Sequence, residues 1–238
     1  GNFIIGNPVE AKYGLTYDQI AVAFKAAADQ GARRFGLHTM VASNELNQEY
    51  MAETVQMLLA LVEEISAHLD IRFEFINMGG GLGIPYRPED EPIDLAIMSD
   101  AISKLFQKFK TDNGYVPKLY MESGRFMTGP HGALVVRSIN QKQIYRNYIG
   151  VDASMQALMR PGMYGAYHHI TVPAKLGQPA VGPVDVVGAL CENNDKFAIQ
   201  RELPRIDEGD LMVIHDTGAH GHSMGFNYNG QLRPKELL

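Results

Sequence analysis

The sequence predicts an α/β portion followed by a mainly antiparallel β domain. Over the first half of the chain, three apolar runs of strand length alternate with helical patterns, and this alternation indicates parallel βαβ connections. After about Gly132 the pattern changes to short β-branched runs separated by Gly, Pro, Asn and Asp. Such a pattern is typical of an antiparallel domain of roughly a hundred residues.

The first half begins with a helix predicted over residues 16–30, where apolar residues recur at helical spacing and Gly31 follows as a candidate C-cap. A strand-like run at 34–38 comes next. A loop follows at 42–44, and a long helical pattern then extends over 49–69. These elements make the first unit of strand, loop and helix.

Two further units repeat this order. The apolar run 73–78 ends at the glycine-rich loop 79–83, and a helix is predicted over about 94–110. A third run, 118–121, ends at the turn 122–125. The predicted strands therefore run in one direction, as parallel strands joined by helices do.

The second half contains four β-branched runs that are predicted as strands: 133–137, 148–151, 181–187 and 211–214. Turn-forming residues separate these runs. The sequence has no internal repeat and no low-complexity linker, so nothing marks a flexible connection between the two halves.

The composition excludes several classes of function. The net charge is −6 and no cluster of Lys and Arg could neutralise a row of phosphates, so nucleic-acid binding is not expected. No apolar run approaches the roughly 20 residues that span a bilayer, so a membrane protein is not expected. One cysteine excludes internal disulfides, and twelve methionines with no signal-like segment fit a reducing cytoplasm. A small-molecule ligand is favoured.

The chain starts at residues 1–5 within an apolar run and without an initiator Met, which predicts a fragment.

Candidate site residues cluster where the predicted parallel strands end. His38 with Ser43, the glycine triplet 79–81, and Glu122 with Arg125 each follow a strand. In a (β/α) barrel, that face holds the active site. The glycines would let backbone N–H groups approach a phosphate. The alternative is a tight turn against a neighbouring strand.

Glu122 and Arg125 lie three residues apart, so both can face a ligand from one turn. A pyridine cofactor would use both groups, because a carboxylate opposite the ring nitrogen keeps the ring protonated. The arginine could bind a phosphate or a carboxylate through two parallel hydrogen bonds. The alternative is an ion pair that closes the loop.

The β domain adds candidates for carboxylate recognition and acid catalysis. Arg160 and Tyr164 are spaced to recognise a carboxylate, although a surface arginine and a packed tyrosine would give the same pattern. Cys191 follows an apolar run and stands beside Glu192. A lone cysteine is also commonly a small buried hydrophobe, so both interpretations of Cys191 stay open.

Histidines are frequent in the second half, but no metal site is predicted there. His220 and His222 show neither zinc-finger nor metalloprotease spacing, and no thiol accompanies them. His168 and His169 are adjacent, and neighbours on a strand point to opposite faces of a sheet.

Seven short segments carry a further signal: Gly36 to His38, Gly79 to Gly83, Glu122 to Arg125, Asp152 to Met155, Arg160-Pro161 with Tyr164 to His168, Cys191-Glu192, and Gly225 to Asn229. Taken in order, they resemble the alanine-racemase-like pyridoxal-phosphate decarboxylases, and most closely the diaminopimelate decarboxylase family. The similarity covers nearly the whole chain. Seven segments in the family's order at plausible spacing are hard to obtain by chance.

The resemblance implies the C-terminal portion of such an enzyme. Residues 1–131 are expected to form the C-terminal part of a pyridoxal-phosphate-binding (β/α)8 barrel, and residues 132–238 a C-terminal β-sandwich or β-barrel domain. In this family a lysine near the end of the first barrel strand binds the cofactor covalently. No lysine here has the expected Tyr-Ala-x-Lys context. The segment alone is therefore expected to be inactive.

The resemblance also implies residue roles. Glu122 would face the pyridine nitrogen, and Cys191 would return a proton to the substrate carbon after carbon dioxide has left. The implied cofactor-binding residues are Ser43, Gly81, Glu122, Ser123, Gly124, Arg125 and His220. The implied substrate-binding residues are Arg125, Arg160, Tyr164 and Glu192. Met40 occurs where the family has a histidine stacked on the ring, and His220 occurs where it has a phosphate-binding tyrosine.

The implied reaction is the pyridoxal-phosphate-dependent decarboxylation of meso-diaminopimelate to L-lysine, the last step of lysine biosynthesis. Arg160 beside Tyr164 favours a substrate with a second carboxylate. The alternatives are decarboxylation of ornithine, lysine or a carboxylated polyamine precursor, and a non-catalytic relative that binds a partner. In the family, residues of the Cys-Glu type enter the neighbouring subunit's barrel, so the resemblance implies a homodimer with shared active sites.

Overall fold

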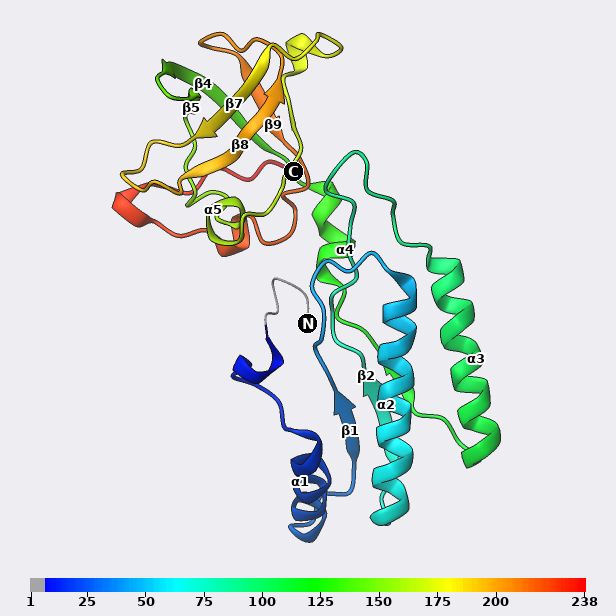
Figure 1. Cartoon of the computed structure of the whole chain (residues 1–238). Coiled ribbons are helices and arrows are strands. Elements are labelled where there is room, and N and C mark those ends of the chain that lie inside the picture. Colours follow the sequence, from blue (N-terminus) through cyan, green and yellow to red (C-terminus); the bar gives the residue numbers. More distant parts are fainter. Residues whose placement is uncertain (1–6) are drawn as a thin grey trace. The chain divides into compact units, whose positions relative to one another are not determined.

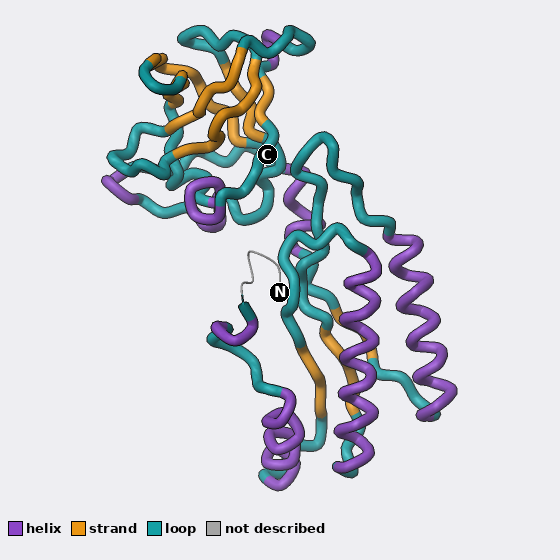
Figure 2. Tube along the Cα trace, viewed as in Figure 1, coloured by secondary structure: helices purple, strands orange, loops and turns teal. Residues whose placement is uncertain are grey.

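The computed structural model describes residues 7–238, so the apolar start of the chain at 1–5 lies outside the described residues. The described chain divides into two compact units. The first unit comprises residues 7–84 and 91–123, and the second comprises 85–90 and 124–238. The two tracings of the chain show helices and parallel strands in the first unit and mainly strands in the second (Figure 1, Figure 2).

The first unit contains a three-stranded parallel sheet in the order β1-β2-β3. Its strands are β1 (Phe35–His38), β2 (Phe73–Asn77) and β3 (Lys118–Tyr120). Helix α2 (Gln48–His68) connects β1 to β2, and α3 (Leu95–Asn113) connects β2 to β3. Figure 1 shows α2 and α3 side by side along the sheet. The predicted order of strands and helices, and their parallel direction, are confirmed.

Local capping explains where these helices begin and end. Asn47 accepts a hydrogen bond from the N–H of Glu49 at the start of α2, and Asp94 does the same for Ala96 and Ile97 at the start of α3. The helix predicted to end near residue 110 continues to Asn113, because the left-handed residue that stops it is Gly114, with φ +70°. Helix α1 (Tyr17–Asp29) starts with a capping box formed by Thr16 and Gln19.

A register shift interrupts the pairing of β1 with β2. The register between β1 and β2 shifts after Phe35, so that Gly36 pairs with Phe75. Phe73 and Ile76 are buried, and Phe24 of α1 packs edge-on against Phe73 at 4.9 Å between ring centroids. The ring of Phe75 covers Gly36, where a Cβ atom would overlap it. A larger residue at position 36 would therefore force the Phe75 ring to move.

The second unit contains one continuous sheet of six strands in the order β6-β9-β4-β5-β7-β8. Neighbouring strands are antiparallel except for β5 and β7, which are parallel. The mainly antiparallel domain is therefore confirmed. A single sheet also differs from the two facing sheets of a sandwich. The strands are β4 (Leu134–Gln143), β5 (Asn147–Val151), β6 (Ile170–Thr171), β7 (Gly182–Val187), β8 (Lys196–Leu203) and β9 (Leu211–Ile214).

The core of the second unit is mainly aliphatic and also contains the fully buried Phe197. Fully buried residues include Val151, Val186, Met212 and Ile214. Two short helices, α4 (Gly124–Thr128) and α5 (Arg160–Tyr164), interrupt the strand order. Five 3-10 turns complete the described elements: Pro8–Glu10, Gly129–His131, Pro173–Lys175, His222–Met224 and Tyr228–Gly230. No helix among the described residues is long and apolar enough to cross a membrane.

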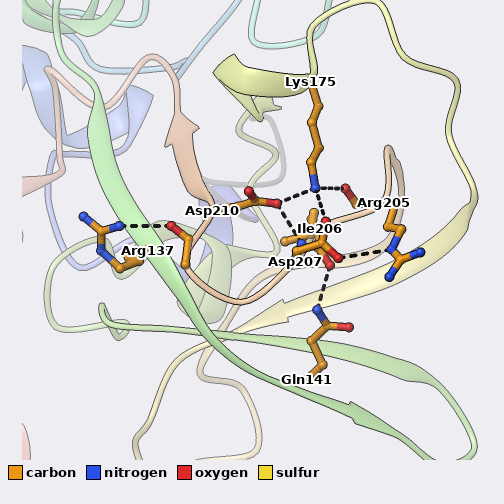
Figure 3. Close-up of polar contacts among 8 residues, drawn as sticks. Arg137, Gln141, Lys175, Arg205, Ile206, Asp207 and Asp210 are labelled. Atoms are coloured by element: carbon orange, nitrogen blue, oxygen red, sulfur yellow. Dashed lines mark hydrogen bonds and ion pairs between the residues drawn. The ribbon is translucent and has the colours of Figure 1, made fainter.

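A network around Lys175 fixes the loop between β8 and β9 (Figure 3). The Nζ of Lys175 donates hydrogen bonds to Asp207 at 2.7 Å, to Asp210 at 2.6 Å and to the carbonyl oxygen of Arg205 at 2.7 Å. These partners raise the pKa of Lys175 and lower the pKa of both aspartates. Gln141 of β4 donates to the carbonyl oxygen of Ile206 at 2.7 Å. The loop is thus bound to two other parts of the unit.

Candidate functional site

Three polar side chains meet at the carboxyl edge of the parallel sheet. His38 ends β1, Asn77 ends β2, and Glu122 follows β3. Asn77 Nδ2 donates to Glu122 Oε1 at 2.8 Å, and His38 Nε2 lies 3.5 Å from the same oxygen. The Glu122 side chain stays 55% exposed, so a ligand can reach its carboxylate. We call His38, Asn77 and Glu122 the strand-edge group.

Asn77 was not predicted as a site residue, although a signal for it exists in the sequence. It is the last residue of β2 and stands two positions before the glycine triplet. Its Oδ1 accepts a hydrogen bond from the Gly79 N–H at 2.9 Å, while its Nδ2 binds Glu122. Asn77 therefore links the glycine loop to the carboxylate.

The glycine loop allows the ends of the three strands to come close together. Gly79 and Gly81 have φ angles of +74° and +101°, which other residues rarely adopt. A Cβ atom at Gly80 would lie 2.7 Å from the carbonyl oxygen of Glu122, and one at Gly81 would lie 2.6 Å from that of Ala42. The tight-turn interpretation of these glycines is therefore confirmed.

The same loop limits which N–H groups could bind a phosphate. Gly79 N–H donates to Asn77, and Gly80 N–H donates to the Met40 sulfur at 3.3 Å. Within residues 7–238, the N–H of Gly81 has no acceptor. Gly81 is thus the member of the triplet whose N–H is suited to an anion, and its role as a cofactor residue stays a prediction. Met40 lies against the loop, at the position where a ring-stacking histidine was expected.

The two candidate serines lie beside this edge. Ser43 follows Ala42, whose carbonyl oxygen faces Gly81, and it is half-buried. Ser123 follows Glu122, and its hydroxyl is buried with no hydrogen-bond partner among the described residues. A buried hydroxyl without a partner costs about 1–3 kcal/mol. A ligand oxygen at Ser123 would remove that cost.

A second group of candidates meets inside the second unit. We call Tyr86, Arg125, Arg160 and His168 the arginine group. Arg125 donates to the Tyr86 hydroxyl at 2.8 Å, and the Arg160 guanidinium lies 4.6 Å from the centroid of the Tyr86 ring. Arg160 is only 3% exposed, so the interpretation of Arg160 as a surface residue is wrong. Two guanidinium groups are therefore buried against one tyrosine.

The arginine group is electropositive. Burial lowers the pKa of Arg160, and the charge of Arg125 lowers it further. The pKa of His220 is also lowered, by burial and then by the charges of Arg125 and Arg160. Among the described residues no carboxylate forms an ion pair with Arg160. Tyr164, at the other end of α5, is close enough to influence the Arg160 charge. This surrounding suits an anion.

The loop that carries Cys191 and Glu192 is held by hydrogen bonds. Buried Asp195 accepts from the N–H of Met155 at 2.7 Å and from that of Leu190 at 2.9 Å. Asn194 of the same loop donates to the carbonyl oxygen of Gly162, in α5, at 3.2 Å. The Cys191 loop therefore packs against the helix that carries Arg160 and Tyr164.

Cys191 itself is exposed, so the interpretation of this thiol as a small buried hydrophobe is wrong. Asn229 Nδ2 donates to its sulfur at 3.3 Å. The Tyr228 hydroxyl donates to Glu192 Oε1 at 2.7 Å. The segment 225–229, which was part of the resemblance, thus contacts both residues of the Cys-Glu pair.

The predicted site residues fall into the two units. Ser43, Gly81, Glu122 and Ser123 belong to the first, and Gly124, Arg125, Arg160, Tyr164, Cys191, Glu192 and His220 belong to the second. Among the described residues no group of three or more His, Cys, Asp or Glu side chains could hold a metal ion.

Comparison with known proteins identifies the family. The family model described as pyridoxal-dependent decarboxylase, C-terminal sheet domain, matches residues 17–218. This chain belongs to the pyridoxal-dependent decarboxylases. The match extends over both units, and the cofactor of the family is the one that the resemblance implied.

Individual known proteins match nearly the whole chain. Protein TabA of Pseudomonas amygdali pv. tabaci is 49% identical over 98% of this chain and 55% of its own length. The diaminopimelate decarboxylase of Methanothermobacter thermautotrophicus is 37% identical over 96% of this chain and 54% of its own length. The crystal structure of diaminopimelate decarboxylase from M. jannaschii in co-complex with L-lysine has a TM-score of 0.84 at 32% identity, and the match covers 94% of this chain and 52% of that one. The chain spans about half the length of the curated relatives that it matches.

The strand-edge group and its neighbours fit the cofactor of a pyridoxal-dependent decarboxylase. Glu122 offers an accessible carboxylate for a ring nitrogen. Among residues 7–238 the Gly81 N–H has no acceptor and the buried Ser123 hydroxyl has no partner, so both can bind phosphate oxygens. Lys118 stands at the start of β3, at the opposite end of the strand from Glu122. A covalent lysine outside residues 1–238 stays a prediction.

Proposed function

We propose that this chain is the C-terminal portion of a decarboxylase that converts meso-diaminopimelate to L-lysine. The observation that carries the proposal is the arginine group, in which Arg125 and Arg160 are buried against Tyr86. Diaminopimelate bears two carboxylates, of which one is lost, and a buried guanidinium is a suitable partner for the other. The named diaminopimelate decarboxylases among the relatives support the same substrate.

Pyridoxal phosphate, when bound, supplies the electron sink that allows an amino acid to lose its carboxylate. In our proposal Glu122 faces the pyridine nitrogen and keeps it protonated, while Asn77 holds the Glu122 carboxylate. The residues proposed to hold the cofactor are Ser43, Gly81, Glu122, Ser123, Gly124, Arg125 and His220. His220 suits an anion because it lies near two arginines.

The residues proposed to bind the substrate, and the residue proposed to donate a proton to it, belong to the second unit. Arg125, Arg160, Tyr164 and Glu192 are proposed to bind the carboxylates and the distal amino group of the substrate. Cys191 is proposed to return a proton to the α-carbon, since its thiol is exposed and Asn229 orients it. Glu192 would attract the distal ammonium group, and Tyr228 holds its carboxylate.

The wider architecture is part of the proposal. Residues 1–131 are assigned to a partial (β/α)8 barrel and residues 132–238 to the C-terminal domain of a cytoplasmic homodimer with shared active sites. This segment alone is expected to be inactive.

Mixing Cys191→Ala subunits with subunits that lack the covalent lysine tests whether the active sites are shared between subunits. Half of the reassorted dimers are mixed, each with one intact site of two, so activity should recover to about a quarter of wild type. No recovery despite subunit exchange would contradict sharing.

A second substrate class has a specific observation in its favour. TabA, at 49% identity, carries a different name from the diaminopimelate decarboxylases at lower identity. Another diamino acid, such as ornithine, lysine or a carboxylated polyamine precursor, is therefore the second candidate. Decarboxylation of such a substrate would use the same chemistry, and Arg160 and Glu192 would set the preference between the two substrate classes.

The deciding experiment is a comparison of substrates on the full-length protein. Turnover of meso-diaminopimelate, lysine and ornithine is measured by release of carbon dioxide, with the visible absorbance of bound cofactor as a check on loading. We expect a preference for meso-diaminopimelate of about 30-fold or more, because a buried guanidinium without its carboxylate costs about 2–5 kcal/mol. Equal turnover of all three would contradict the proposal, a preference for lysine or ornithine would favour the second candidate, and no turnover by the loaded protein would favour a non-catalytic relative.

A further inference from the structure

Arg160 keeps its guanidinium buried in an unfavourable electrostatic setting. Its side chain is 3% exposed, and the charge of Arg125 acts against it. A buried cation is retained only when its hydrogen bonds and its charge find partners. A flexible arginine would otherwise turn toward water. Two neighbouring side chains, His168 and Tyr86, supply these partners.

The hydrogen bond between Arg160 and His168 has only one possible direction. Arg160 Nη1 lies 2.7 Å from His168 Nε2, and an arginine can only donate. Nε2 must therefore be the unprotonated, accepting nitrogen. The proton then resides on Nδ1, which donates to the carbonyl oxygen of His215 at 2.8 Å. The backbone of His215 thus fixes the tautomer of His168, and that tautomer accepts from Arg160.

The neutral form of His168 is required for this arrangement. His168 is fully buried, and burial lowers its pKa to about 4 from 6.5. The nearby charges of Arg160, Arg125 and Arg201 lower it further. A protonated His168 would remove the acceptor and add another positive charge. Near neutral pH, His168 is therefore an uncharged acceptor within a cationic group.

Tyr86 completes the support. Its ring face lies 4.6 Å from the Arg160 guanidinium, within the range of a cation–π interaction. Its hydroxyl accepts from Arg125 at 2.8 Å, and its ring meets His168 edge-on at 5.1 Å. One side chain therefore sets the position of both guanidinium groups and of the histidine.

We propose that His168 and Tyr86 are positioning residues, which hold the Arg160 guanidinium in the orientation that receives a substrate carboxylate. The inference rests on the proposed function of Arg160 as a substrate ligand. It assigns no chemical step to His168, because its two ring nitrogens are occupied by Arg160 and by the His215 carbonyl oxygen.

The test compares two replacements of His168 in the full-length protein. In His168→Asn, the amide can still donate to His215 but no longer reaches Arg160, whereas in His168→Gln the amide oxygen can replace Nε2. We expect His168→Asn to raise the KM for meso-diaminopimelate about tenfold or more, the usual effect of losing a hydrogen bond to a charged group, with kcat within about threefold. His168→Gln should stay within about threefold in both constants.

A double-mutant cycle separates positioning from general damage. In an Arg160→Lys background, His168→Asn should change KM less than about twofold, because the lysine has no guanidinium to orient. His131→Asn, at an exposed histidine of the same unit, should leave KM unchanged. Val186→Ala, which weakens the buried core without contacting Arg160, should lower the unfolding midpoint with KM unchanged.

A second readout does not depend on activity or on the cofactor. Nitrogen NMR of arginine side chains should show slow rotation of the Arg160 guanidinium in the wild type and in His168→Gln, and fast rotation in His168→Asn and Tyr86→Leu. Fast rotation in the wild type, or an equal effect of His168→Asn with and without Arg160, would overturn the inference. If Arg160→Ala leaves KM unchanged while rotation responds as expected, the role of Arg160 in the proposed function fails and the positioning stands.

Discussion

The strand-edge group and the arginine group differ in how they hold their charge. In the strand-edge group the Glu122 carboxylate is 55% exposed and is held by one amide and one histidine. In the arginine group Arg160 is 3% exposed, and its contacts come from a neutral histidine and a tyrosine ring. Water can solvate the first charge before a ligand binds, whereas the second has already lost its water. The folded protein has therefore already met the cost of desolvating Arg160. Removing the Arg160 side chain should weaken ligand binding more than removing the Glu122 carboxylate.

The largest expected effect follows from Arg160→Ala. Loss of a buried guanidinium leaves a substrate carboxylate without a partner, which costs about 2–5 kcal/mol, so kcat/KM for meso-diaminopimelate should fall by about 30-fold or more. Steady-state kinetics measure this value. Arg205→Ala, at a surface arginine of the same unit, is the control and should change kcat/KM less than about twofold. A fall of the same size for both variants would contradict the proposed role.

Acid should weaken the arginine group through His168. The folded-state pKa of His168 is about 4, below the ordinary value of 6.5. Between these pH values the unfolded chain binds a proton that the folded protein does not. The free energy of unfolding should therefore fall as the pH falls from 6.5 to 4, by up to about 3 kcal/mol from this residue.

Urea denaturation of the wild type and of His168→Gln over this pH range isolates the effect, since glutamine does not titrate. As the pH falls from 6.5 to 4, we expect the free energy of unfolding of the wild type to decrease relative to that of His168→Gln. Parallel curves for the two proteins would show that His168 does not titrate between the two values.

A smaller effect is expected in the strand-edge group from Glu122→Gln. The amide cannot stabilise a proton on the ring nitrogen, so kcat should fall by about 10- to 100-fold while the cofactor still binds. Turnover and the visible absorbance of the bound cofactor measure the two properties separately. Asp90→Asn offers a matched change of charge outside the group. Wild-type turnover in Glu122→Gln would exclude the proposed contact with the ring.

The smallest effect concerns the scaffold. Lys175→Met removes three hydrogen bonds that fix the loop between β8 and β9, so the thermal midpoint should fall by roughly 2–4 °C. Lys25→Met is the control, because within the described part of the chain Lys25 pairs with exposed Asp29 alone, on the same helix, and such pairs contribute little. Calorimetry measures both midpoints. Substrate KM should not change in either variant, and a change in Lys175→Met would connect this loop to the arginine group.

The sequence was sufficient for the elements whose pattern is local. The parallel strands were predictable because each apolar run ends in Gly or in a polar turn, and α2 was predictable from its apolar periodicity. Strand β8 was not predicted, because Lys196–Leu203 includes Gln, Arg and Glu and has a single β-branched residue. Strand β6 has two residues, too few for any periodicity.

Candidate site residues could be proposed from the sequence where a motif names them, as for Glu122, Arg160 and Cys191, and their roles stay predictions. Contacts between distant positions could not be proposed in this way. Tyr86 and His168 are 82 positions apart, and although His168 ends one of the seven segments, nothing in the sequence pairs it with Tyr86, so their contact is seen only in the folded unit. The sequence excluded His168 as a metal ligand but did not predict that its neutral tautomer accepts a hydrogen bond from Arg160. Asn77 required knowledge of the register that brings β2 beside Glu122.

The parallel pairing of β5 with β7 affects how Arg160 reaches its place during folding. Parallel neighbours need a long crossover connection, and here that connection covers residues 152–181 and includes α5, the helix of Arg160. Closing it is a non-local event, which is slow compared with forming a hairpin. The β4–β5 hairpin should therefore form early, and the arginine group late, only after β7 has joined the sheet. Pulse-labelling hydrogen exchange should protect the amides of β4 and β5 before those of β7.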